Sequence, residues 1–352
     1  MKIGIITWHN MQNYGSMLQA YALQKVLEQR GHIVKVIDYR NFVPSRLKAR
    51  IFNSSKLTKK IKILATKGKW KHFLKFQNKY LKLTRLILTN DELEKIGQQF
   101  DCYICGSDQI WSPNVFDKTY FLDFVPNEKI KISYSPSVVI DGYNNEQKEI
   151  ISKELKHFRA ISLRENKGAQ IIKNITGIDC KVNLDPTLLL EKSDWDKLTK
   201  DTKTEESYLL CYMLNYNKEQ IEIVRQIAET NNLKIINIGE DDVGIGEWDI
   251  NVGPLEFLNY VKNASIVCTD SYHGSLFSIN FNKQFYTFER FKGNDTINQN
   301  DRIYEILEKL NLSYRIVTNS DYSKQVIDFT SVNNKLKKYR KESLQYINDN
   351  IE

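Results

Sequence analysis

The chain has 352 residues, more than a single hydrophobic core usually serves, so we expect two domains. Hydrophobic residues make up 41% and charged residues 27%, a composition that excludes a disordered or fibrous chain. The longest apolar runs have the length of strands, which excludes a membrane-spanning helix, and no nucleic-acid motif accompanies the net charge of +8.

Strand and helix signals alternate from the start of the chain, as they do in α/β proteins with parallel sheets. Residues 2–7 predict a strand, residues 16–31 a helix that Gly31 ends, and residues 33–39 the next strand. Further strands are predicted at 102–105, 130–135, 160–163 and 180–184. We expect these elements to form a Rossmann-like domain over residues 1–190.

This domain contains a basic helical insertion at about 41–90. Between Asp38 and Asp91 there is no acidic residue, but there are fifteen Lys or Arg. Apolar residues recur at helical spacing over 70–81, with lysines between them, which predicts a basic amphipathic helix. One interpretation is a solvated helix that packs its apolar stripe on the domain. The other is a surface, over 46–85, that docks on an anionic membrane or a polyanionic lipid-linked glycan.

A polar, charged stretch from Glu191 to Glu206 predicts a linker with a short helix. The alternating block that follows is expected to form a second Rossmann-like domain over 205–318, facing the first across a cleft. Its strands are predicted at 208–214, 234–239, 248–252, 265–269 and 284–288, and its helices at 217–230, 254–263, 274–282 and 301–312. The tail, 319–352, is predicted to be helical and to pack back on the first domain.

Ligands of such sheets bind beyond the carboxyl ends of the strands, so the loops there are candidate sites. The segment TDSYHGS, residues 269–275, follows a strand and begins a helix, where unpaired N–H groups and the helix dipole favour an anion. Gly274 allows close approach of the backbone, and Ser271 and Ser275 can cap the helix or bind an oxyanion. His273 can donate a proton near neutral pH. The alternative is a capped helix start with an incidental His.

Two loops of the first domain are also polar. In ICGSDQIWSPN, residues 104–114, Asp108 could accept a proton from a sugar hydroxyl, and Gln109 and Trp111 could hold the sugar. The alternative is that Asp108 caps a short helix and Trp111 belongs to the core. The first strand-to-helix loop lacks the pattern G-x-G-x-x-G, so a dinucleotide site has no support. Its candidates for contact with an acceptor or a phosphate are Asn13, Tyr14, Ser16 and Gln19.

Two further features are predicted to be structural. The segment LDPT is predicted to be a hinge, in which Pro186 fixes the turn after a strand and Asp185 caps. The five His residues are scattered without the spacing of metal ligands, so no metal site is predicted.

Four motifs occur in this order along the chain: NMQNYGSMLQAYAL, CGSDQIWSPN, LDPTLLL and DSYHGSLFSINFNKQF. Together, over roughly residues 1–315, they resemble the polysaccharide pyruvyl transferase family. The resemblance implies a GT-B-like fold, with the acceptor on the first domain and the donor on the second. It implies transfer of the pyruvyl group of phosphoenolpyruvate, a co-substrate, onto sugar hydroxyls of a cell-surface polysaccharide or its lipid-linked precursor, which forms a pyruvate ketal. It implies no cofactor.

In the family, the loop that matches 269–275 meets phosphoenolpyruvate, and its His, here His273, is implicated in catalysis. Family members carry Arg two residues before this His, where this sequence has Ser271. Another cation is then needed for the phosphate. We rank as candidates Arg164, which matches an Arg-Glu pair common in the family, then Arg302 and Arg290.

These residues suggest roles for a transfer reaction. We expect His273 to act as the acid or as a phosphate partner, Asp108 as the base, and Arg164 as the residue that holds the anion. A glycosyltransferase of the GT-B type with a nucleotide-sugar donor, and a non-catalytic relative that binds glycan or membrane, remain alternatives. Because the start of the chain predicts a strand and not a signal peptide, we expect a cytoplasmic protein, with peripheral contact at the inner face of the membrane.

Overall fold

The computed structural model describes residues 1–40, 56–87, 89–140, 142–199, 206–290, 300–318 and 322–351, and for 56–67 it describes the backbone alone. Part of the predicted membrane-contact segment, residues 46–55, lies outside the described residues. Within the described ranges, no helix is both long and apolar enough to cross a membrane.

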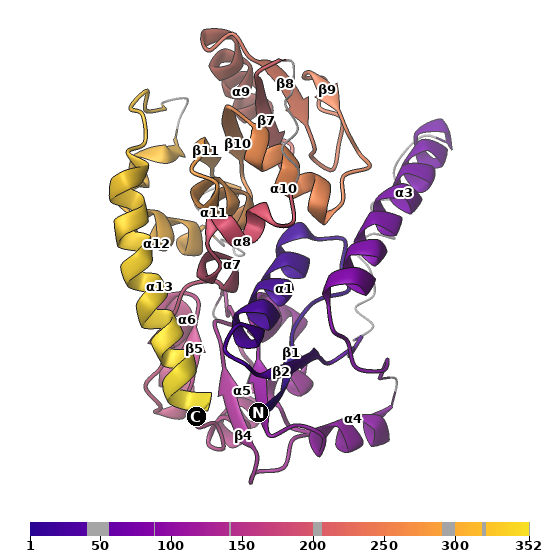
Figure 1. Cartoon of the computed structure of the whole chain (residues 1–352), viewed down its shortest axis with the longest axis vertical. Coiled ribbons are helices and arrows are strands. Elements are labelled where there is room, and N and C mark those ends of the chain that lie inside the picture. Colours follow the sequence, from indigo (N-terminus) through magenta and orange to yellow (C-terminus); the bar gives the residue numbers. More distant parts are fainter. Residues whose placement is uncertain are drawn as a thin grey trace.

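The first domain is built on a parallel sheet with the strand order β2-β1-β3-β4 (Figure 1). A bridge between Ile132 and Ala160 continues this sheet to the pair β5-β6. Residues 3–6 of β1 and all of β3 are buried on both faces of the sheet, and these residues are apolar. The strands are β1 (Lys2–Ile6), β2 (Ile33–Val36), β3 (Cys102–Cys105), β4 (Ile130–Ser133), β5 (Ser162–Leu163) and β6 (Lys181–Val182).

Helices cover both faces of this sheet. They are α1 (Tyr14–Glu28), α4 (Asn90–Gly97), α5 (Asn145–Leu155), α6 (Asn166–Thr176), α7 (Pro186–Leu189) and α8 (Lys192–Asp196), with the 3-10 turns η1 (Gln109–Trp111), η2 (Pro113–Val115) and η3 (Lys118–Phe121). Several begin at side-chain caps, such as Asn13 for α1 and Asn144 for α5. Such caps set where each helix starts, and therefore which residues end each preceding loop.

The second domain has the strand order β12-β11-β10-β7-β8-β9, and all its pairs are parallel. Its strands are β7 (Tyr208–Tyr212), β8 (Lys234–Asn237), β9 (Glu247–Trp248), β10 (Ile266–Thr269), β11 (Gln284–Phe288) and β12 (Ile316–Val317). Its helices are α9 (Lys218–Thr230), α10 (Pro254–Asn263), α11 (Tyr272–Asn280) and α12 (Asp301–Lys309), with the 3-10 turn η4 (Ser313–Arg315).

Each sheet has a point at which the order of its strands reverses. In the second domain it lies between β7 and β10, and in the first between β1 and β3. Loops at the carboxyl ends of such strands diverge and leave room for a ligand. The segments 269–275 and 104–114 follow β10 and β3, so both predicted loops lie at these points.

Two long helices connect the domains. One, α3 (Lys56–Tyr80), belongs to the first domain in sequence, and the other, α13 (Phe329–Ile351), follows the sheet of the second domain. α3 reaches the second domain, where His72 Nδ1 lies 2.9 Å from Glu256 Oε1 on α10. α13 runs back along the first domain to its far end (Figure 1). There the hydroxyl of Tyr346 donates to the carbonyl of Ser133 at 2.9 Å.

A continuous apolar core joins the two domains. Tyr14, at the start of α1, stacks on Phe73 of α3 and on Phe257 of α10, with ring centroids 5.4 and 4.6 Å apart. Its hydroxyl donates to the carbonyl of Val252 at 3.0 Å. The domains therefore pack directly on each other beside the loops that carry the predicted site.

Candidate active site

The loop after β10 is held by its own side chains. The carboxylate of Asp270 accepts hydrogen bonds from two backbone N–H groups of the loop after β7, at 2.7 and 3.0 Å. Ser271 is the N-cap of α11, and its hydroxyl accepts from the N–H of Gly274 at 3.3 Å. These contacts fix the first turn of α11, in which His273 is 9% exposed.

Gly274 and Ser275 also serve this local structure. A Cβ on Gly274 would come within 2.5 Å of Thr269 Oγ1, so glycine allows α11 to approach β10. Ser275 Oγ donates to the carbonyl of Ser271 at 3.2 Å and lies 2.8 Å from Thr287 Oγ1. The hydroxyls predicted to bind the donor, at 271 and 275, are therefore engaged within the second domain.

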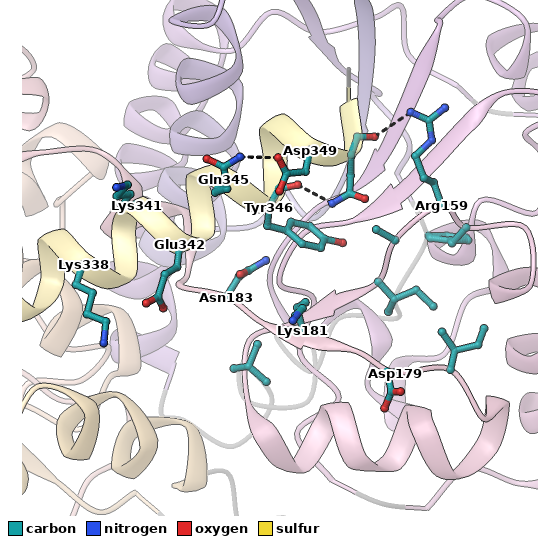
Figure 2. Close-up of a pocket in the computed structure, with 16 residues that line it drawn as sticks. Arg159, Asp179, Lys181, Asn183, Lys338, Lys341, Glu342, Gln345, Tyr346 and Asp349 are labelled. Atoms are coloured by element: carbon teal, nitrogen blue, oxygen red, sulfur yellow. Dashed lines mark hydrogen bonds between the residues drawn. The ribbon is translucent and has the colours of Figure 1, made fainter.

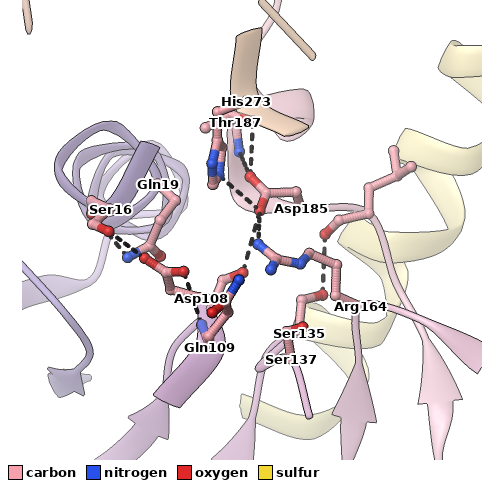
Figure 3. Close-up of polar contacts among 12 residues, drawn as sticks. Ser16, Gln19, Asp108, Gln109, Ser135, Ser137, Arg164, Asp185, Thr187 and His273 are labelled. Atoms are coloured by element: carbon pink, nitrogen blue, oxygen red, sulfur yellow. Dashed lines mark hydrogen bonds and ion pairs between the residues drawn. The ribbon is translucent and has the colours of Figure 1, made fainter. Parts of the chain in front are cut away.

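Asp185, which follows β6, is the centre of the polar cluster (Figure 3). Its Oδ2 lies 2.9 Å from Arg164 Nη1, 3.4 Å from His273 Nε2 and 3.3 Å from Ser107 Oγ. Its Oδ1 accepts from the N–H and the hydroxyl of Thr187, at 2.9 and 2.8 Å. Burial opposes ionisation of Asp185, but His273 and Arg164 outweigh it and hold the pKa of the carboxyl well below its ordinary value.

Sequence reasoning assigned Asp185 to a hinge and missed this role. The capping contact with Thr187 exists, but the same carboxylate also links Arg164 to His273. The available signal was its position directly beyond the carboxyl end of a strand in a doubly wound domain, the rule that drew attention to Asp108.

His273 is enclosed by the first domain on its other side as well. Gly15 lies in the first turn of α1, and a Cβ there would be 2.0 Å from His273 Nδ1. Asn13 fixes this turn, because its side chain accepts from the N–H of Ser16 at 3.0 Å. The His of the second domain thus lies between Gly15 and Asp185 of the first. The site is shared by both domains, as the choice of Arg164 and Asp108 from the first domain and His273 from the second had anticipated.

Asp108 adopts a backbone conformation that few residues other than glycine can adopt. Its φ is 79° and its ψ −179°, a region that costs an L-residue about 1–3 kcal/mol. Its carboxylate accepts from the hydroxyl of Ser16 and, at 2.8 Å, from the N–H of Gln109. Such strain is found most often where function requires it, which favours a role for this carboxylate.

Arginines from both domains gather around the ring of Tyr272. The guanidinium carbons of Arg164, which follows β5, and of Arg302, on α12, lie 4.6 and 5.3 Å from the ring centroid. Arg290 Nε lies 3.4 Å from Asp270 Oδ2. Loss of water around its guanidinium, and then the charges of Arg164 and Arg290, lower the pKa of Arg302 to about 9. Crowded like charges of this kind indicate a place that an anion would stabilise.

Arg164 has donors that no described residue accepts. Its Nη1 is bound to Asp185 and its Nε lies 3.9 Å from Glu165 Oε2. Within the described ranges, neither Nε nor Nη2 has a hydrogen-bond acceptor, although the side chain is 1% exposed. Buried donors without acceptors are costly and rare, so they indicate where a bound oxyanion would complete the site.

Three residues predicted to contact the acceptor lie inside the core. Trp111 is fully buried and stacks on Phe121, with ring centroids 4.9 Å apart. Tyr14 is enclosed at the domain interface, and Gln19 donates to Thr7 Oγ1 at 3.0 Å with no exposed surface. Side chains this deeply buried cannot reach a sugar, so we reassign these three to the fold. Of the acceptor set, Asn13 and Gln109 are partly exposed.

A comparison of the sequence with known families bears on this cluster. The sequence model described as polysaccharide pyruvyl transferase matches residues 13–290. The chain belongs to the polysaccharide pyruvyl transferase family. The matched span of this pyruvyl transferase ends before α12 and contains Gly15, Asp108, Arg164, Asp185 and His273. The predicted family, and with it an enzyme of this kind, is confirmed.

Solved structures similar to this pyruvyl transferase establish the fold. A UDP-GlcNAc 2-epimerase from Neisseria meningitidis, bound to UDP-GlcNAc, has a TM-score of 0.52 and 10% identity, covering 97% of this chain and 94% of that chain. A putative UDP-N-acetylglucosamine 2-epimerase from Listeria monocytogenes has a TM-score of 0.51 and 9% identity, covering 96% and 94%. At such identities the likeness concerns the fold alone. It confirms the prediction of two Rossmann-like domains in a GT-B-like arrangement.

A partial likeness to a curated protein carries no functional argument. A trigger factor from Buchnera aphidicola subsp. Schizaphis graminum (strain Sg) is 30% identical over 147 residues, which are 37% of this chain. The chain spans about a third, 33%, of the length of that relative.

Proposed function

We propose that this pyruvyl transferase moves the pyruvyl group of phosphoenolpyruvate onto two hydroxyls of one sugar and forms a ketal. The acceptor in this proposal is a cell-surface polysaccharide under synthesis, or its lipid-linked precursor. The observation that carries the proposal is the buried guanidinium of Arg164, with two nitrogens that lack acceptors within the described ranges, beside Arg302 and His273. A small, strongly anionic donor suits such a site.

In the proposal, the arginines of the site bind the donor and His273 acts as the acid. Arg164 and Arg302 bind the phosphate and the carboxylate of the donor. These two arginines take over the role of the Arg that family members carry at the position of Ser271. Asp185 Oδ2 lies 3.4 Å from Nε2 of His273 and Gly15 packs against Nδ1, so the first domain positions the ring from both sides. His273 then donates a proton to the methylene carbon of the donor.

The remaining steps need a base and two sugar hydroxyls. Protonation leaves a cation at C2, which the first hydroxyl attacks as Asp108 accepts its proton. The second hydroxyl then displaces phosphate from C2 and closes the ketal. Of the two hydroxyl protons released, one balances the proton now on the methyl group, and the other leaves with the phosphate. Strain at Asp108 and its bond from Ser16 support a fixed position for this base.

Phosphate release from phosphoenolpyruvate in the presence of an acceptor tests this proposal. We expect His273→Ala and Arg164→Ala each to abolish release while the unfolding temperature stays near that of the wild type. Matched controls are His157→Ala and Arg225→Ala, which change exposed residues of the same types. Turnover at the wild-type rate in either site variant would remove that residue from the mechanism.

The identity of the donor has an independent test. We expect phosphoenolpyruvate to raise the unfolding temperature, and a panel of nucleotide sugars to leave it unchanged. The opposite pattern would favour the glycosyltransferase alternative. Comparison of the organism's surface glycan with and without this gene, by mass spectrometry, decides the product: the proposal requires loss of ketal-linked pyruvate.

We propose, in addition, that the reaction takes place in the cytoplasm, with α3 in contact with the anionic inner face of the membrane. The support is a row of exposed lysines four residues apart, Lys71, Lys75 and Lys79. Phe73 and Phe76 are buried in the core, so the contact in this proposal is electrostatic and not an insertion of the apolar stripe.

Co-sedimentation with vesicles that contain anionic lipid tests this contact. Binding should fall when Lys71, Lys75 and Lys79 are changed to Gln, and it should fall in high salt. Matched controls are Gln variants of three exposed lysines elsewhere, Lys153, Lys156 and Lys218. Equal loss in both sets would show that net charge, and not α3, determines the binding.

A further inference from the structure

A groove of about 890 Å³ lies between α13 and the edge strand β6, apart from the cluster around Asp185 (Figure 2). Its size is within the range of cavities that hold a ligand. Phe158 and Ile161 give it an apolar side, and Gln345 and Asn350 bring amide groups to it. The groove extends from the beginning of β6 towards Asn183.

The groove is lined by cations that the fold does not neutralise. Within the described ranges, Lys181, Lys338 and Lys341 form no ion pair. Arg159 is bound to a backbone carbonyl, that of Asn350, at 3.4 Å. A cation that pairs with no carboxylate of its own chain is available to an anionic ligand.

The carboxylates of the groove are partly engaged. Asp179 lies 2.6 Å from Lys173, which is outside the groove, and Asp349 accepts from Gln345 at 2.5 Å. Glu342 is the remaining carboxylate of the lining. Four cations of the lining thus face two carboxylates, Glu342 and Asp349, that no cation pairs with within the described ranges, so the groove carries a net positive charge.

An unsatisfied donor lies on the floor of the groove. Asn183 is 7% exposed, and its Nδ2 has no hydrogen-bond partner within the described ranges. Figure 2 places its side chain between Glu342 and Lys181, with Tyr346 beside it. A buried amide donor costs free energy unless something accepts its hydrogen bond, so this atom points to a ligand with an acceptor.

We propose that this groove binds a carboxylate-bearing stretch of polysaccharide, away from the sugar that reacts. The lysines suit carboxylates, the amides suit hydroxyls, and Phe158 and Ile161 suit the apolar faces of sugar rings. The proposal rests on the proposed function, because pyruvyl transfer adds a carboxylate to the polymer, so units already modified are anionic. Asn183 precedes Asp185 by two residues, which is about 7 Å along an extended chain, so one polymer could reach both places.

Calorimetric titration of the full chain without any donor tests this binding. The probe is hexagalacturonate, a saccharide with a carboxylate on each unit, and the neutral probe is maltohexaose. We expect hexagalacturonate to bind, more weakly as salt rises, and maltohexaose to bind at least tenfold more weakly. Equal affinity for the two probes, or no binding of hexagalacturonate, would overturn the proposal.

Variants locate the binding. We expect Lys338→Glu with Lys341→Glu to weaken hexagalacturonate at least tenfold, and Asn183→Leu to weaken it severalfold, with unfolding temperatures checked for each. The control is Lys153→Glu with Lys218→Glu, the same change of charge on exposed residues outside the groove. Equal loss in the control pair would refute the location. Since no donor is present, a negative result here leaves the proposed transfer standing, and failure of the transfer assay leaves this binding result standing.

Discussion

Replacement of Gly15 by Ala tests whether the first domain positions His273. The added Cβ would lie 2.0 Å from His273 Nδ1, and ordinary contact begins at 3.4 Å, so the ring or α1 must move by about 1.4 Å. The ring has little room to retreat, because Asp185 lies 3.4 Å from its other nitrogen. Misplacement by about 1 Å at a reacting group costs on the order of 100-fold in rate. We therefore expect phosphate release to fall by about that factor.

The unfolding free energy of Gly15→Ala distinguishes the clash with His273 from a change in the helix propensity of α1. Ala is favoured over Gly in helices by up to about 1 kcal/mol, so without the clash Gly15→Ala would stabilise α1. Overpacking typically costs about 1–3 kcal/mol, so we expect net destabilisation in urea unfolding. In the double variant with His273→Ala the ring is gone, and the substitution at Gly15 should no longer destabilise. Additive effects of the two substitutions, together with turnover at the wild-type rate in Gly15→Ala, would refute the reasoning.

Three further substitutions follow from the charges of the structure. Asp185→Asn should lower phosphate release about 100-fold, because the amide cannot hold both Arg164 and His273 as the carboxylate does, and a steady-state rate near that of the wild type would contradict this. Arg302→Met should raise the unfolding temperature, since the fold disfavours this charge, while the shift produced by phosphoenolpyruvate should shrink; a lower unfolding temperature would oppose the first claim. Burial raises the pKa of Asp38, but hydrogen bonds from His9 and Arg40 outweigh it and bring it to about 2. The stabilisation by ionised Asp38 is thus present above the ordinary value of 3.8 and lost as pH falls towards 2. Asp38→Asn should remove about 2 kcal/mol of unfolding free energy at pH 7 and much less near pH 2, as urea titrations at both pH values would show.

The sequence alone determined the features that depend on neighbours along the chain. Apolar runs and helical spacing located most of the strands and helices, and the loops at 104–114 and 269–275 were found because they follow strands. Asp108 and His273 were chosen by this rule, and Arg164 by its match to an Arg-Glu pair of the resembling family; the structure brings the three into one cluster. The signals are local, because capping, turn chemistry and periodicity involve residues within a few positions of each other.

The tertiary structure decided which of these residues meet, and through what. Asp185 joins Arg164 to His273, which is 88 positions away in the chain, and Gly15 touches a ring more than 250 positions away. Trp111, attractive as a sugar platform in the sequence, is buried against Phe121 by the packing of η1 on η3. Neither periodicity nor spacing encodes such contacts, because they depend on how distant segments pack within the first domain and, for His273, on how the two domains pack against each other. The sequence therefore specified the ends of the strands, and the packing of the domains determined which side chains meet there.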